Sequence, residues 1–218
     1  SAQDLGFAIA PRLNAAGRMD DMGLGIDTLL TDNFAMAQQA AQLLDQINIE
    51  RRSVEQGMQL EALAMLEKLQ LNETTQAAAY CLYDESWHQG VIGLLASRIK
   101  EKLHRPVIVF APGEPGEIKG SARSITGVHI RDVLVNVAAK YPDLILRFGG
   151  HAMAAGLTLK QNDFSLFEQA FREAVQLSAD PSVFERALYS DGELSAQELN
   201  LQLAEQLPVL APWGQAFP

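Results

Sequence analysis

One stretch decides the fold: AAAYCLYDESWHQGVIGLLASRIKEKLHRPVIVF, at residues 77–110. Its apolar start, 77–83, predicts a buried strand, and residues 106–110 predict a second one. Between them lies a polar loop at 86–90, followed by a segment with an apolar residue at every fourth position, which predicts one face of a helix: Val91, Leu95, Ile99 and Leu103. Short strands that alternate with helices predict an α/β or α+β fold.

The alternation of strands and helices continues toward the carboxyl end. Residues 112–116 hold two Pro and two Gly, which are typical of a turn into a strand at 118–125. The further expected elements are a helix at 131–139, a short apolar run at 144–148, a strand at 154–159 and an amphipathic helix on Phe164, Phe167, Phe171 and Ala174. Beyond residue 182 we expect a new unit, with a strand at 187–189, a turn at Asp191-Gly192 and an acidic helix at 195–207.

Upstream, residues 33–71 contain no Pro and one Gly, and Ala, Gln, Leu and Glu dominate. This composition predicts one long helix or two nearly continuous ones, capped by Thr31, Asp32 or Asn33. At ~1.5 Å per residue a single helix would span about 55 Å, which is more than a compact domain needs. Such a helix is typical of a connection between two bodies, although a core helix of a bundle remains an alternative.

Composition excludes several classes of protein. With 48% hydrophobic and 20% charged residues, the 218-residue chain is neither disordered nor fibrous. A single cysteine, Cys81, excludes an internal disulfide and favours a reducing, cytoplasmic setting. No apolar run reaches the roughly 18 residues of a membrane helix. Because the chain starts at Ser1 and stops at Pro218, we expect a piece of a longer protein.

The net charge of −10 argues against binding nucleic acid through the whole surface. The charge is unevenly distributed, however. Ten of the 17 basic residues lie in 81–160 beside seven acidic ones, so this segment carries +3 while the remainder carries −13. A locally basic face on an acidic protein is one interpretation, and ordinary scatter of surface charge is the other.

Two clusters point to phosphate or nucleotide chemistry. In Gly120-Ser-Ala-Arg-Ser124, hydroxyls flank a guanidinium next to a glycine, which suits a phosphate, although a polar edge strand would look the same. In Phe148-Gly-Gly-His-Ala152, paired glycines before a histidine bring backbone close to a flat or charged ligand, although tight helix–sheet packing is an alternative.

Two further stretches are weaker candidates. Residues 11–19 hold Arg12, Asn14 and Arg18 and suit a phosphate-facing turn or a bare loop. Residues 87–90, with His88, precede a helix whose N-terminus could receive an anion. No hydrolase triad, Walker loop or dinucleotide fingerprint occurs, and the four histidines lack partners at zinc spacing. Three carboxylates are the nearest approach to a two-metal centre: Asp20, Asp21 and Asp27.

Taken together, these motifs resemble the bacterial RecJ single-stranded-DNA exonucleases of the DHH phosphoesterase superfamily. The resemblance rests on 12–18, 88–93, 120–124 and 149–152, in this order and spacing. It implies an α/β fold with the end of a DHH domain at 1–32 and a long connecting helix at 33–71. A DHH-associated nucleic-acid-binding domain with a mixed sheet would follow at 72–180, and the beginning of an OB-fold-like domain at 181–218.

The resemblance also implies a function. Family members degrade single-stranded DNA from the 5′ end, in repair and recombination, with Mn or Mg bound by Asp and His residues of the DHH domain. Those residues are missing here, so we expect no bound metal and no nuclease activity from this chain alone. The expected partners are single-stranded DNA and a single-strand-binding protein, and no membrane.

Site residues carry over position by position. Ser121 and Arg123 match the positions that hold the 5′-phosphate, and Gly149, Gly150 and His151 match the nucleotide-binding motif. His151 would assist by donating to the scissile phosphate. The same cleft is expected to include Arg12, Asn14 and Arg18, and more loosely Ser124 and His88.

Two other functions remain open at this stage. A superfamily phosphoesterase acting on short oligonucleotides or cyclic dinucleotides would use the same glycine–histidine motif. Because both flanks of the chain are acidic, a protein-interaction or assembly module without DNA affinity is the alternative from a different class.

Overall fold

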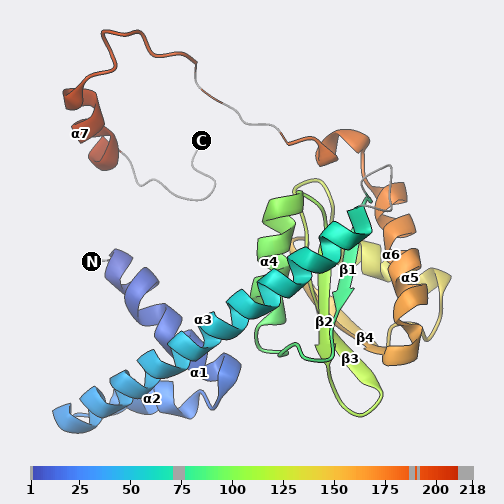
Figure 1. Cartoon of the computed structure of the whole chain (residues 1–218), viewed down its shortest axis with the longest axis horizontal. Coiled ribbons are helices and arrows are strands. Elements are labelled where there is room, and N and C mark those ends of the chain that lie inside the picture. Colours follow the sequence, from blue (N-terminus) through green and yellow to red (C-terminus); the bar gives the residue numbers. More distant parts are fainter. Residues whose placement is uncertain (1, 71–76, 187–189, 191, 211–218) are drawn as a thin grey trace. The chain divides into compact units, whose positions relative to one another are not determined.

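The computed structural model describes residues 2–70, 77–186, 190 and 192–210. The chain divides into two units, residues 1–185 and residues 186–218. The larger unit contains a five-stranded sheet and the helices α1 to α6, and the smaller unit contains helix α7 (Leu201–Leu210) (Figure 1).

The sheet is mixed, as expected, with the strand order β1-β2-β3-β5-β4. β1 (Tyr80–Tyr83) and β2 (Val107–Pro112) run parallel, and helix α4 (Ile92–Leu103) forms the crossover that a parallel pair requires. β3 (Glu117–Arg123) pairs antiparallel with both β2 and β5 (Ala154–Lys160), and β5 pairs antiparallel with the edge strand β4 (Arg147–Gly150).

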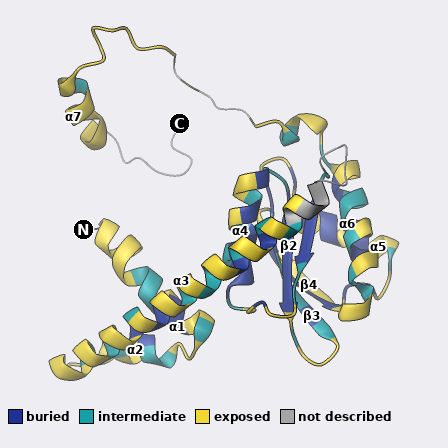
Figure 2. Cartoon of the chain, in the orientation of Figure 1, coloured by how far each residue is buried: buried dark blue, intermediate teal, exposed yellow. Residues whose placement is uncertain are grey.

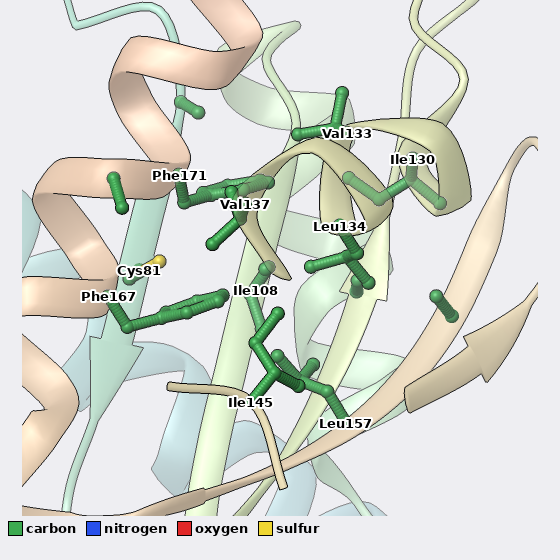
Figure 3. Packing of buried hydrophobic residues seen from close by; sticks show 14 of the residues in the cluster. Cys81, Ile108, Ile130, Val133, Leu134, Val137, Ile145, Leu157, Phe167 and Phe171 are labelled. Carbon is green, nitrogen blue, oxygen red and sulfur yellow. The ribbon is translucent and has the colours of Figure 1, made fainter. Parts of the chain in front are cut away.

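Two apolar clusters hold the sheet between helices. On one face, helices α5 (Ile130–Lys140) and α6 (Phe164–Ser178) bury side chains such as Leu134 and Phe167 against Ile108 and Leu157 of the strands (Figure 3). On the other face, α4 and part of α3 cover β1 and β2. β4, at the far edge, is exposed along its whole length.

Helix α3 (Phe34–Gln70) is one continuous helix of 37 residues, which confirms the long helix expected from composition. The Asn33 side chain caps it by accepting from the backbone N–H groups of Ala35 and Met36. Helices α1 (Ala10–Met19) and α2 (Gly23–Leu30) pack on α3, where Leu44 and Ile47 are buried (Figure 2).

The following part of α3 packs on α4 and the sheet. Met58 and Ala62 of α3 belong to the same buried cluster as Leu95. The indole of Trp87 is 3% exposed and donates from Nε1 to Glu61 Oε2 of α3 at 2.8 Å. Helix α3 therefore carries α1 and α2 at one end and the sheet at the other.

Some sequence expectations need correction. Residues 11–19, expected as a turn or a loop, lie in helix α1, because Pro11 fits the first helical turn and the buried Ala15 and Ala16 allow close packing. The helix expected at 195–207 begins at Leu201 and ends at Leu210. The strand expected at 187–189 and the turn residue Asp191 lie outside the described residues. Three short helical segments complete the described elements: a π-helix at Asp4–Ile9 and 3₁₀ helices at Gln161–Asp163 and Pro181–Phe184.

Among the described residues, no helix combines the length and the apolar character that a membrane span requires.

Candidate nucleic-acid interface

Strand β3 sorts its residues onto two faces. Because successive side chains of a strand point to opposite sides, Ile118 and Ala122 enter the core under α5 and α6, whereas Lys119, Ser121 and Arg123 are partly exposed on the α4 side. The alternation therefore places the hydroxyl and the guanidinium of the predicted phosphate cluster side by side.

Hydrogen bonds hold the Arg123 guanidinium in one position. Nε donates to Ser97 Oγ of α4 at 3.2 Å, and Nη1 donates to Ser121 Oγ at 3.0 Å and to the Ala122 carbonyl at 2.8 Å. A Cβ at Gly93, in the first turn of α4, would lie 2.8 Å from Arg123 Nη2. Gly93 therefore leaves space for the guanidinium at a helix N-terminus, where backbone N–H groups favour anions.

Arg18, in the last turn of α1, lies near the same place. Its Nη1 donates to the Gly90 carbonyl at 3.4 Å, and a Cβ at Gly90 would overlap the Arg18 carbonyl oxygen, so the two backbones are in close approach. Burial lowers the pKa of Arg123, and repulsion by Arg18 lowers it further. Neither arginine forms an ion pair within the described residues.

Two close cations without a counter-ion make this place favourable for an anion. Arginine stays protonated at neutral pH even when its pKa falls, so the repulsion is present whenever the site is empty. A phosphate would relieve it and would accept the forked hydrogen bonds of a guanidinium. We call Arg18, Gly93, Ser121 and Arg123 the arginine site.

A row of bare backbone adjoins the arginine site. Gly156 of β5 is paired with Ser121 on one side and with Gly149 of β4 on the other. Both glycines are exposed, a Cβ at Gly149 would have no atom within 4 Å, and one at Gly156 would have a single atom at 4.0 Å. Packing therefore does not require glycine at either position, and a ligand can approach the backbone there. We call Ser121, Gly156 and Gly149 the glycine row.

His151 lies next to this row, at the turn between β4 and β5. It is exposed, its backbone N–H donates to the Ala154 carbonyl at 2.8 Å, and its Nδ1 accepts from the Met153 N–H at 3.4 Å. In this arrangement a neutral imidazole carries its proton on Nε2, which can donate to a phosphate oxygen. Ala154 is also the register partner of Arg123, so His151 and Arg123 flank the same residue.

The structure places the other predicted site residues as follows. Arg12 Nε is paired with Asp45 Oδ1 of α3 at 2.8 Å, so this guanidinium ties α1 to α3. Asn14 is exposed on α1. His88 lies in the exposed loop before α4, where its Nδ1 accepts from the Gly90 N–H at 3.1 Å. Ser124 is 1% exposed and donates to the Val128 carbonyl at 2.6 Å, so it stabilises a turn rather than facing the arginine site.

Two residues that position Arg123 were not predicted from the sequence. Gly93 and Ser97 orient Arg123, and their spacing of four residues on α4 puts them on one helix face, with Ser97 Oγ donating to the Gly93 carbonyl at 3.1 Å. A glycine and a serine at helical spacing are too common to be recognised without the strand that faces them. Trp87, expected to belong to an anion-binding helix start, is instead a buried link to α3.

The described residues do not offer a metal site. No group of three or more His, Cys, Asp or Glu side chains comes together among them, so the carboxylates of Asp20, Asp21 and Asp27 do not form a centre with other ligands. The donor set of this part of the chain does not fit a divalent metal ion.

The paired glycines differ in a way that stability measurements can detect. Gly150 has φ +151°, and its Cβ would overlap the Ala154 carbonyl oxygen and approach Ala155 Cα to 2.5 Å. We expect Gly150→Ala to lower the free energy of unfolding by about 1–3 kcal/mol or more. Gly149→Ala, its matched control, should change it by less than about 1 kcal/mol, since nothing lies within 4 Å. Urea unfolding curves of both variants check this, and equal losses would contradict it.

Comparison with known proteins gives consistent matches. The family model described as the DHHA1 domain matches residues 74–177. The single-stranded-DNA-specific exonuclease RecJ of Escherichia coli is 51% identical over 218 residues, all of this chain and 38% of its own length. The protein of the same name from Thermus thermophilus is 35% identical over 217 residues. The chain thus spans well under half the length of these curated relatives.

Solved structures agree with the sequence matches. The crystal structure of RecJ with Mg²⁺ from Thermus thermophilus superposes with a TM-score of 0.78 at 34% identity, over all of this chain and 32% of that one. A structure of exonuclease RecJ bound to manganese gives a TM-score of 0.65 at 35% identity, over 81% of this chain and 42% of that one. With sequence identity along the whole chain and the same fold, the chain belongs to the RecJ family of the DHH superfamily.

Proposed function

We propose that this chain is the nucleic-acid-binding part of a 5′→3′ single-stranded-DNA exonuclease, and that its arginine site holds the 5′-terminal phosphate of the strand. The observation that carries the proposal is the pair Arg18 and Arg123, two neighbouring cations that have no carboxylate partner among the described residues. Relatives named as single-stranded-DNA-specific exonucleases support this assignment.

The chemistry of the strand end fits the arginine site. A 5′-terminal phosphate carries close to two negative charges, whereas an internal diester carries one, so two arginines and a helix N-terminus discriminate in favour of the end. The nucleotide that follows the phosphate would lie on the glycine row, and His151 would donate from Nε2 to the phosphate to be cleaved. Selection of the end sets the polarity of degradation without any reading of base sequence.

Hydrolysis itself requires groups beyond these. In the intact enzyme we assign the Mn or Mg ion to the DHH domain, because the described part of this chain has no group of ligands for it. This chain alone is therefore expected to bind DNA without cleaving it. Asn14 and Arg12, on α1, would border the DNA-binding cleft on the side of the DHH domain. His88 would border the edge of this cleft near Gly90.

The cellular setting follows from the same proposal. An exonuclease of this kind would act in DNA repair and recombination in the cytoplasm, on strands that a single-strand-binding protein also covers. A phosphoesterase for short oligonucleotides or cyclic dinucleotides would need the glycine row and His151 but not an extended basic face. An assembly module would need neither, and the uncompensated arginines favour the DNA-binding function over it.

End selection can be tested directly with this chain. We expect a single-stranded oligonucleotide with a 5′-phosphate to bind about tenfold more tightly than the same oligonucleotide with a 5′-hydroxyl, in fluorescence-anisotropy titrations at low and moderate salt. The difference should shrink as salt rises. Equal affinities would remove end recognition from this chain, and absence of any binding would favour the assembly module.

A further inference from the structure

A second basic row crosses the sheet two residues beyond the glycine row. In the register of the strands, Lys119 of β3 pairs with Thr158 of β5, and Thr158 pairs with Arg147 of β4. These three residues also line a cavity of about 450 Å³, together with Glu114, Phe148, Gly156 and Leu157. Gly156 belongs to both the cavity and the glycine row, so the cavity is continuous with the surface beside the arginine site.

The two cations of this row are available to a ligand. Lys119 Nζ contacts only the neutral Gln89 Oε1, at 3.3 Å, among the described residues. Arg147 is paired with Glu117 at 3.4 Å, but its side chain is 70% exposed. Exposed ion pairs contribute between zero and about 1 kcal/mol, so Arg147 can exchange this partner at little cost. Thr158, 8% exposed, lies between them as a short polar floor.

We propose that Lys119, Thr158 and Arg147 form a second phosphate subsite, which holds a backbone phosphate downstream of the 5′ end. The inference rests on the proposed function, because it takes the arginine site as the position of the 5′-phosphate. Lys119 and Arg123 are four residues apart on one strand, or about 13 Å at ~3.4 Å per residue. That distance exceeds the roughly 3.4 Å rise per nucleotide of a stacked strand several-fold, so the two subsites contact different nucleotides.

The glycine row explains how one strand can reach both subsites. It lies between them and carries no side chain beyond the Ser121 hydroxyl, so sugar and base can lie against the sheet. Two carboxylates lie at the far end of the cavity and repel phosphate. Glu114 lines the cavity, and Glu117 is paired with Arg147. The strand is therefore expected to leave the sheet after the second subsite.

The test compares a long and a short ligand on the whole 218-residue chain. The ligands are a 5′-phosphorylated thymidine decamer, measured by fluorescence anisotropy, and thymidine 5′-monophosphate, measured by chemical-shift titration. We expect Lys119→Ala and Arg147→Ala each to weaken decamer binding about five- to tenfold and to reduce the slope of log affinity against log salt by about 0.7. The monophosphate should bind these variants as it binds the parent, because it does not reach the second row.

Matched variants separate contact from folding. Lys140→Ala removes an exposed lysine of α5, which lies on the opposite face of the sheet and is paired with Glu173, and should leave decamer affinity unchanged. The charge-conserving changes Lys119→Arg and Arg147→Lys should keep most of the binding. Parental decamer affinity in Lys119→Ala and Arg147→Ala would overturn the second subsite, as would loss of monophosphate binding in them. The proposed function fails on a different result, namely equal decamer affinity with and without the 5′-phosphate.

Discussion

Replacing Phe167 by Ala is expected to lower the free energy of unfolding of the larger unit by about 3–5 kcal/mol. Phe167 of α6 is fully buried. Its ring stacks on that of Phe171, with 5.9 Å between the centroids, and meets the ring of Phe110 edge to face at 5.7 Å. Alanine would leave a cavity among aromatic rings that cannot collapse without moving β2, the strand that carries Phe110. Urea unfolding followed by circular dichroism measures the change.

The neighbouring Leu166 is the matched control for this prediction. It lies on the same helix but is 47% exposed, so Leu166→Ala should cost no more than about 1 kcal/mol. DNA binding by Phe167→Ala should be retained in the folded fraction, because the ring lies on the face of the sheet opposite the arginine site. A loss of stability no larger than that of Leu166→Ala would show that the aromatic cluster does not hold the sheet.

Apart from the exposed strand β4, the strands and helices between residues 80 and 178 could be predicted, because burial alone produces their patterns. In α4, Leu95, Ile99 and Leu103 recur every fourth residue because a single face is buried. Helix α1 lacks such a stripe, since its buried residues are only Ala15 and Ala16, and its sequence therefore predicts a turn or a loop instead. Small buried residues leave no hydrophobic period to detect.

The site was only partly predictable, for a geometric reason. The cluster at 121–123 is local, and its chemistry is visible in the sequence. Side chains alternate between the two faces of a strand, so the alternation that puts Ser121 and Arg123 on one face puts Ser124 on the other. This alternation is visible in the sequence and argues against Ser124 as a site residue. The approach of Arg18 to Arg123 depends on how α3 carries α1 toward the loop before α4, and no local pattern encodes that contact.

The basic row of Lys119 and Arg147 shows the same limit. Each residue is an ordinary surface cation in its own strand, and β4 is too short and too rich in glycine to be recognised by alternation. Only the register through Thr158 brings the two cations to one cavity. Register depends on pairing between strands rather than on any single strand, so the row became visible only in three dimensions.

Replacing Arg123 by Ala is expected to weaken binding of a 5′-phosphorylated oligonucleotide by about 1.5–3 kcal/mol, or roughly 10- to 150-fold. The guanidinium is held by Ser97 and Ser121, so little of its freedom is lost when a phosphate binds. Without the Arg123 guanidinium, Arg18 is no longer repelled by a second cation, so Arg18 should retain part of the affinity for the phosphate. Anisotropy titrations with phosphorylated and hydroxyl-ended strands measure both the affinity that is lost and the affinity that remains.

The decisive comparison is a thermodynamic cycle in which Arg123 and the 5′-phosphate are removed separately and together. If Arg123 contacts the terminal phosphate, Arg123→Ala should remove most of the tenfold preference for a 5′-phosphate, so that hydroxyl-ended strands lose up to about tenfold less affinity than phosphorylated ones. Arg123→Lys should recover only part of the preference, because an ammonium cannot form the forked hydrogen bonds of a guanidinium. Arg98→Ala, on the exposed side of α4, is the matched control and should preserve it. An equal loss for both strand ends would mean that Arg123 binds the backbone generally, and the terminal phosphate would then have to be held elsewhere.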